Sequence, residues 1–209
     1  MDPRAEALLH FWFGRVPPTP ESVAARATFW FEPTPEEDAD LARRFGALHA
    51  EAHAGELDAW QDEPRGALAL VLLLDQLPRN LFRGSARAFA SDARALAVAR
   101  AALARGDDAE LVPIETAFLL LPLEHAESME AQEESVRRVE ALAHGAPPAW
   151  REMLEGWADY ARQHRDIVAR FGRFPHRNRA LGRASTAEES AFLSAGGPSF
   201  GQGATDERG

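Results

Sequence analysis

Two histidines and two carboxylates stand at positions where a helical core would normally be apolar, and these residue types can move protons. His164 lies on the apolar face of a predicted helix, one turn after Tyr160 and one turn before Val168. Burial favours the neutral imidazole, so we expect its pKa to fall unless a carboxylate holds the proton. A hydrogen-bonded core histidine and a working acid or base both remain open for this position.

Asp75 closes a leucine-rich predicted helix, where a carboxylate faces the unfavourable negative end of the helix dipole. Arg79, four residues further on, is the nearest group that could compensate it, and Asn80 and Arg83 follow closely. We interpret Asp75 and Arg79 first as a structural clamp under a turn, with catalysis by Asp75 as the alternative.

Glu124 and His125 follow Pro122, in the predicted first turn of another helix. A helix N-terminus favours carboxylates and binds anions, and it would lower the pKa of His125, leaving a neutral donor or acceptor. Imidazole and carboxylate are also metal ligands. Their spacing here matches no strong metal motif, so the sequence predicts neither a metal nor another cofactor.

The loop 170–179 is dense in basic side chains held by a rigid backbone. Gly172 permits a tight turn, and Pro175 fixes the chain that follows. Guanidinium forks suit phosphates and carboxylates, so the loop predicts recognition of a small anion. The alternative is docking against the acidic stretch 107–134. The candidate ligand-binding side chains of this loop are Arg173, His176, Arg177 and Asn178.

Helical signals that could position these residues recur along the chain, and convincing strand alternation does not. Thr34 to Glu37 reads as a capping box, and the run 64–76 is apolar on every side, which indicates a fully buried helix that Pro78 ends or, less simply, a buried strand. Residues 113–144 form either two helices or one helix kinked at Pro122. The other predicted helices are 4–13, one from 20, 34–55, 92–105, 149–171 and one from a capping box at 185–188 to 193.

Composition narrows the function further. The 209 residues carry a net charge of −10 and no cysteine, and all 23 basic residues are arginine. Disulfides, thiolate chemistry and lysine Schiff bases are therefore excluded, and broad binding to nucleic acid or to an anionic membrane is disfavoured. No apolar run is long enough to cross a bilayer and no secretion signal opens the chain, so we expect a cytoplasmic protein. Residues 1–195 are predicted to form one helical domain, followed by a flexible tail over 196–209.

Charge is unevenly distributed. Residues 107–134 contain nine acids and no arginine, whereas residues 162–183 contain seven arginines and one acid. The simplest interpretation is that the two stretches pack together and neutralise one another.

Several segments resemble a known family. Residues 74–84 read LDQLPRNLFRG, close to the LDQxPRNxFRG signature of a mainly bacterial family, domain of unknown function 924. The segments 11–14 (FWFG), 121–125 (LPLEH) and 171–186 (FGRFPHRNRALGRAST) also resemble it. The resemblance implies an all-α fold similar to tetratricopeptide-like superhelices and no assigned activity.

This chain has Thr116, Leu120 and Ala126 where the family often has arginine, tyrosine and serine, which puts roles of those three positions in doubt. The polar motif positions are Asp75, Arg79, Asn80, Arg83, Glu124, His125, Glu127, His164, Arg173, His176, Arg177 and Asn178.

Two functions fit these observations, and whether the protein is an enzyme is left open. The first is a pocket for a small anionic ligand, with acid–base residues His125, His164, Asp75 and Glu124 and binding residues Arg79, Asn80, Arg83, Arg173, His176, Arg177 and Asn178. The second is a helical protein-interaction module whose groove takes a peptide or partner. A pocket requires the acid–base residues to converge, whereas a scaffold would use them as separate clamps.

Overall fold

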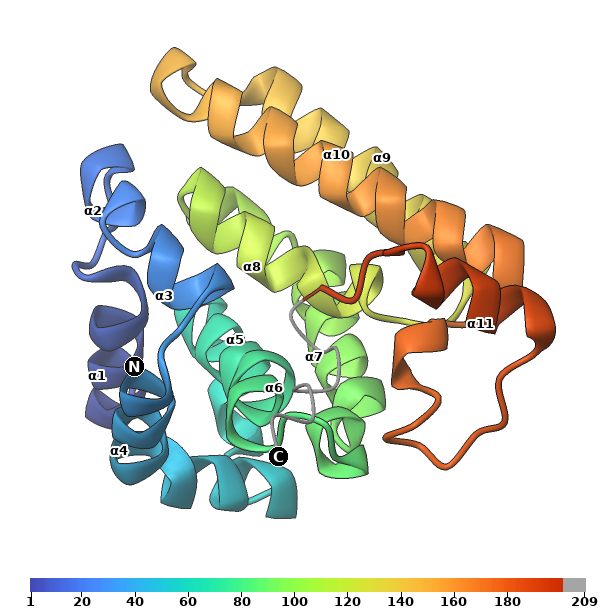
Figure 1. Cartoon of the computed structure of the whole chain (residues 1–209). Coiled ribbons are helices and arrows are strands. Elements are labelled where there is room, and N and C mark those ends of the chain that lie inside the picture. The colour runs from blue at the N-terminus through green and yellow to red at the C-terminus, as the bar shows by residue number, and fades with distance from the viewer. Residues whose placement is uncertain (201–209) are drawn as a thin grey trace.

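The computed structural model describes residues 1–200, and within this range the chain is all-α, without a strand (Figure 1). None of its helices there combines the length and apolar character that crossing a bilayer requires. The helices are α1 (Pro3–Phe13), α2 (Pro20–Ala24), α3 (Ala27–Phe31), α4 (Pro35–Ala54), α5 (Pro64–Val71), α6 (Leu77–Leu81), α7 (Asp92–Arg105), α8 (Pro113–Glu124), α9 (Met129–Gly145), α10 (Pro148–Phe171) and α11 (Ala187–Ser194).

The long amphipathic helices begin and end where their capping residues predict. Thr34 and Glu37 form the reciprocal capping box of α4, and Gly55 ends that helix with a left-handed φ of 93°. Gly172 ends α10 in the same way, with a φ of 71°. The last helix differs slightly from the prediction, because its capping box pairs Thr186 with Glu189 and lies one residue later along the chain.

The leucine-rich segment is a buried helix, as predicted, but it does not stop at Pro78. α5 passes into a π-helical turn, Leu72–Gln76, and then directly into α6. At this wider turn the Leu77 N–H donates to the Leu72 carbonyl, five residues back. Proline has no N–H to donate and normally clashes with the preceding helical turn, so the wider turn lets the helix continue. Asp75 consequently lies inside a continuous helical run rather than at its end.

Pro122 likewise lies inside a helix. α8 continues through it to Glu124, and α9 starts only after Ser128, whose hydroxyl accepts a hydrogen bond from Ala131 N. Glu124 and His125 are therefore at the C-terminal end of α8, and the prediction that they open a helix is wrong. The argument that a helix N-terminus lowers the pKa of His125 does not apply.

α9 and α10 form a long antiparallel pair that lies across α8, while α1 to α4 lie on the other side of the central helices (Figure 1). Phe118 of α8 joins these parts through edge-to-face contacts. Its ring centroid is 5.8 Å from Trp12, 5.4 Å from Phe13, 4.8 Å from Trp30 and 5.1 Å from Trp157. One aromatic cluster thus connects α1, α3, α8 and α10.

The chain after α11 turns back toward α8 (Figure 1). Residues 196–200, the start of the predicted tail, are described and reach the interior side of α10. The rest of that predicted tail, 201–209, lies outside the described residues.

Candidate functional site

The central feature of the site is a carboxylate–imidazole pair formed by Asp75 and His125. Asp75 is fully buried, and His125 Nδ1 lies 2.8 Å from its Oδ1 and 2.9 Å from its Oδ2. Because the carboxylate is ionised, the imidazole must be the donor, which places the proton on Nδ1 and leaves the Nε2 lone pair available. The His125 side chain is 12% exposed, so it is accessible on one edge while its partner is not.

Arg79 holds the other side of Asp75, as the sequence predicts. Its guanidinium lies 3.2 Å from Asp75 Oδ1 and donates to the Asp75 carbonyl at 2.6 Å. It also binds both oxygens of Asp92, at 3.0 and 3.1 Å. Gln76 Nε2 donates to Asp75 Oδ2 at 2.6 Å. Asp75 is thus surrounded by three donors, and the π-helical turn is what directs it among them.

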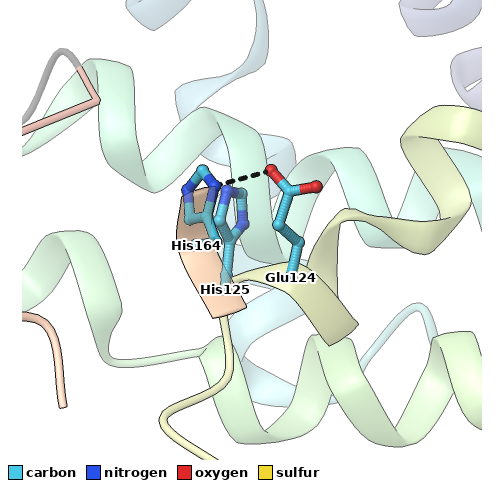
Figure 2. A group of neighbouring side chains, drawn as sticks. All are labelled: Glu124, His125 and His164. Carbon is cyan, nitrogen blue, oxygen red and sulfur yellow. Dashed lines mark ion pairs between the residues drawn. The ribbon is translucent and has the colours of Figure 1, made fainter. Parts of the chain in front are cut away.

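Glu124 and His164 lie beside this pair, and Figure 2 shows their side chains next to His125. His164 Nδ1 is 3.1 Å from Glu124 Oε1 and also donates to the Tyr160 carbonyl at 2.9 Å. The His125 and His164 ring centroids are 6.0 Å apart. Asp75, Glu124, His125 and His164 therefore converge from three separate segments, as the pocket hypothesis requires.

Burial and neighbouring charge displace the pKa values of the two carboxyls in opposite directions. Burial alone would raise the pKa of Asp75, but Arg79 and then His125 offset it and hold that pKa below its usual range. Burial, with a smaller contribution from Asp75, raises the pKa of Glu124 to about 8. At neutral pH one carboxyl is ionised and the other is protonated.

The imidazoles of the cluster are neutral. Burial lowers the pKa of His125, and the positive charge of Arg79 lowers it further. Burial lowers the pKa of His164 well below its usual value, with His125 adding to the effect. His125 is thus a neutral base of fixed tautomer beside a protonated carboxyl.

The loop after α10 brings two nitrogens without a hydrogen-bond partner to the same region. Arg177 is 5% exposed, and its guanidinium contacts Asp92 Oδ2 at 3.3 Å. Its Nε and the Nδ1 of the adjacent His176 have no hydrogen-bond partner among the described residues. Burial and Arg79 lower the pKa of Arg177 to about 10, so it remains charged at neutral pH. Polar nitrogens without a partner are unusual in the interior of a folded protein.

The other polar residues of this loop hold α11 in place. Arg173 binds both oxygens of Glu189 (2.7 and 2.8 Å) and the Ala184 carbonyl (2.9 Å). Asn178 donates to Glu189 and to Ser185. These two candidate ligand-binding residues are therefore engaged with the chain itself.

The acidic stretch pairs mostly with partners other than the arginine-rich stretch. Among the described residues, one ion pair between arginine and carboxylate joins the two, in which Arg183 contacts Glu127 at 2.6 Å. Glu115 pairs with Arg65 instead, and Glu134 with Arg138 in its own helix. The predicted general neutralisation of one stretch by the other is wrong.

Asn80 and Arg83 point away from the acid–base cluster. Both bind Asp38 of α4, Asn80 at 2.8 Å and Arg83 at 3.0 Å. One signature, residues 75–83, thus supplies a buried pair to the site and a separate contact to α4.

Glu124, His125 and His164 can each offer a metal-ligand atom within 4.8 Å of the others. Two features oppose a cation at this position. The His164 Nδ1 that faces Glu124 donates to a carbonyl and so carries a proton. Arg79 and Arg177 are near enough to lower the pKa of His125, and they would repel a cation as well.

Sequence reasoning missed the roles of Asp92 and Phe200. Ser91 occupies the N-cap position of α7, and the Asp92 carboxylate joins Arg79 to Arg177. Phe200 lies in a segment read as a tail, yet its ring stacks on His164 at 3.6 Å. Spacing along the chain carries no signal for either contact, because both join distant segments.

A pocket of about 230 Å³ lies elsewhere, between α1, α3 and α4. It is lined by Phe11, Arg26, Phe29, Glu36, Glu37 and Asp40, so none of the predicted site residues borders it.

Comparison with known proteins identifies relatives without assigning an activity. The structure of the protein of unknown function ATU0120 from Agrobacterium tumefaciens is similar, with a TM-score of 0.78 and 36% sequence identity over 91% of this chain and 97% of that chain. The comparison with curated proteins gives no match. The family described as bacterial protein of unknown function (DUF924) matches residues 8–197. Because this match takes in nearly the whole chain, the protein belongs to the DUF924 family.

Proposed function

We propose that the cluster of Asp75, Glu124, His125 and His164 is an acid–base site for a small anionic ligand. The observation that supports this most directly is the opposite displacement of two carboxyl pKa values on either side of one imidazole. Environments that separate two carboxyls in this way assign an acid and a base. The reaction class is proton transfer, as in hydrolysis or isomerisation.

Three residues of the cluster and two of the loop after α10 have defined roles in this proposal. His125 accepts a proton at Nε2, because Asp75 fixes its other nitrogen as a donor. Glu124, protonated at neutral pH, donates one. Arg177 and His176 bind the anionic group of the ligand through nitrogens that lack a partner. Arg173 is left out, because Glu189 already engages its guanidinium.

Acetate binding across pH tests the anion site, since acetate keeps a constant charge above about pH 6. Below about pH 8 Glu124 is protonated and neutral, so an anion can bind beside it. Above about pH 8 the ionised carboxylate of Glu124 repels that anion. We expect the affinity, measured by calorimetry, to be level near pH 7 and to fall by up to about tenfold per pH unit above pH 8. Glu124→Gln should remove this fall, and a native affinity that is flat to about pH 9.5 would refute the role of Glu124.

Two arginine variants locate the anion. Arg177→Gln should abolish acetate binding, while Arg173→Gln, in the same loop but paired with Glu189, should leave it unchanged. Equal effects of both would count against Arg177 as the anion-binding residue.

The tautomer of His125 tests the base. Nitrogen chemical shifts of the imidazole should show a protonated Nδ1 and an unprotonated Nε2 near pH 7. A proton on Nε2 would leave no base at this position.

A further inference from the structure

The ring of Phe200 lies inside a box of four other rings. It stacks on His164 at a centroid distance of 3.6 Å and an interplanar angle of 19°. The rings of His176 (5.8 Å, 72°) and Phe174 (6.5 Å, 84°) approach it edge to face, and Tyr160 lies at 6.2 Å. This is the geometry with which proteins hold a planar ring.

The rings that form the box are held more rigidly than the ring of Phe200 that occupies it. His164 and Phe174 are buried, and they belong to α10 and to the turn stiffened by Pro175. Phe200 instead lies in the segment 198–200, which makes no hydrogen bond to the rest of the described residues. It is a non-glycine residue with a left-handed φ of 50°, which is unfavourable for a bulky side chain. Ring contacts therefore hold Phe200 in spite of an unfavourable backbone conformation.

The box adjoins the proposed anion-binding nitrogens. His176 forms one wall of the box, and its Nδ1 has no hydrogen-bond partner among the described residues. The guanidinium of Arg177 lies 4.4 Å from the Phe174 ring centroid, on another wall. A ligand whose ring occupies the box would therefore have its carboxylate or phosphate within reach of Arg177.

We propose that this box is a subsite for the planar ring of the ligand and that Phe200 occupies it until the ligand displaces it. The inference rests on the proposed function for the anionic half of the ligand. It narrows the ligand class to small anions bearing an aromatic or heteroaromatic ring.

The test compares anions with and without a ring on the full chain. Occupancy of the box by Phe200 weakens ring binding by the inverse of the fraction of time that the box is open. We expect Phe200→Ala to bind benzoate about tenfold more tightly than the native chain, measured by calorimetry, and to bind acetate equally. The control is Phe82→Ala, which removes a ring that contacts His49 and Arg87 and none of the box residues, and it should change neither affinity. Unchanged or weaker benzoate binding by Phe200→Ala overturns the subsite.

A neutral ring separates this inference from the proposed function. If benzyl alcohol binds Phe200→Ala more tightly than the native chain while neither anion depends on Arg177, the ring subsite stands and the anionic function fails. If acetate depends on Arg177 but the Phe200→Ala variant gains nothing with either ring compound, the anionic function stands and the ring subsite fails.

Discussion

At the scale of single residues, the site depends on two carboxyls that differ in what surrounds them. Asp75 has three donors around it and remains ionised, whereas Glu124 has a second carboxylate as its charged neighbour and keeps its proton. The sequence could indicate both as candidates, Asp75 because it follows a leucine-rich run and Glu124 because it stands beside His125 after Pro122. It could not indicate their charge states, which are set by Arg79 and by depth of burial.

Glu124 makes stability depend on pH in a defined direction. Below its ordinary pKa of 4.5 the carboxyl is protonated in the folded and unfolded chain alike, and between 4.5 and about 8 only the folded chain retains the proton. The free energy of unfolding therefore falls as pH rises through this window and stops falling above it. Glu124→Gln keeps the shape without the ionisation, so we expect it to stabilise the chain by on the order of 3 kcal/mol near pH 7. Urea unfolding should show that gain shrinking toward pH 5, and a gain that is independent of pH would contradict the assignment.

Asp75→Asn should have the opposite effect on stability. The NH2 group of asparagine would face one of the three donors around this position, and Arg79 would lose one carboxylate partner. We therefore expect the free energy of unfolding to fall by about 3 kcal/mol. Asp38→Asn is the matched control, since Asp38 binds Asn80 and Arg83 with its side chain 20% exposed. Its cost should stay within about 1 kcal/mol. Equal losses in urea unfolding would show that burial does not distinguish the two contacts.

At the scale of elements, helix type and most helix boundaries could be predicted, because caps and apolar spacing are local features. The two interior prolines were misleading, since Pro78 and Pro122 both read as helix ends. The helix passes Pro78 through a π-helical turn, and a turn of this kind has no sequence signature. Tyr160 was expected on the buried face of α10 but is 50% exposed. The tetratricopeptide-like arrangement remains a prediction.

Two glycines in helices should respond oppositely to alanine. A Cβ at Gly66 of α5 would lie 2.2 Å from the Trp60 carbonyl oxygen, so Gly66→Ala must push the preceding turn away and should cost about 2 kcal/mol. A Cβ at Gly156 of α10 would meet no atom within 4 Å. Gly156→Ala should therefore stabilise the chain by about 0.5–1 kcal/mol through helix propensity. Melting temperatures that move in the same direction for both variants would refute the close approach at Gly66.

At the scale of the whole molecule, the site exists because three segments far apart in sequence meet. Asp75 comes from the central helical run, Glu124 and His125 from the end of α8, and His164 from α10. Sequence reasoning could propose this meeting from residue types alone, but the pairing of each group required the packing of α10 on α8. Any change that loosens α8 should therefore weaken the site as well as the core.

Phe118 tests whether the molecule unfolds as one unit. Its ring contacts four aromatic rings from α1, α3 and α10, so Phe118→Ala should cost about 3–5 kcal/mol and lower the melting temperature by about 10 °C. Because the tryptophans report on this cluster and circular dichroism reports on all helices, both signals should shift together in a single transition. Phe31→Ala, at a ring that is 55% exposed, should shift them by less than about 1 kcal/mol. If tryptophan fluorescence changed well before helicity in Phe118→Ala, the aromatic cluster would unfold separately from the other helices, and the molecule would not unfold as one unit.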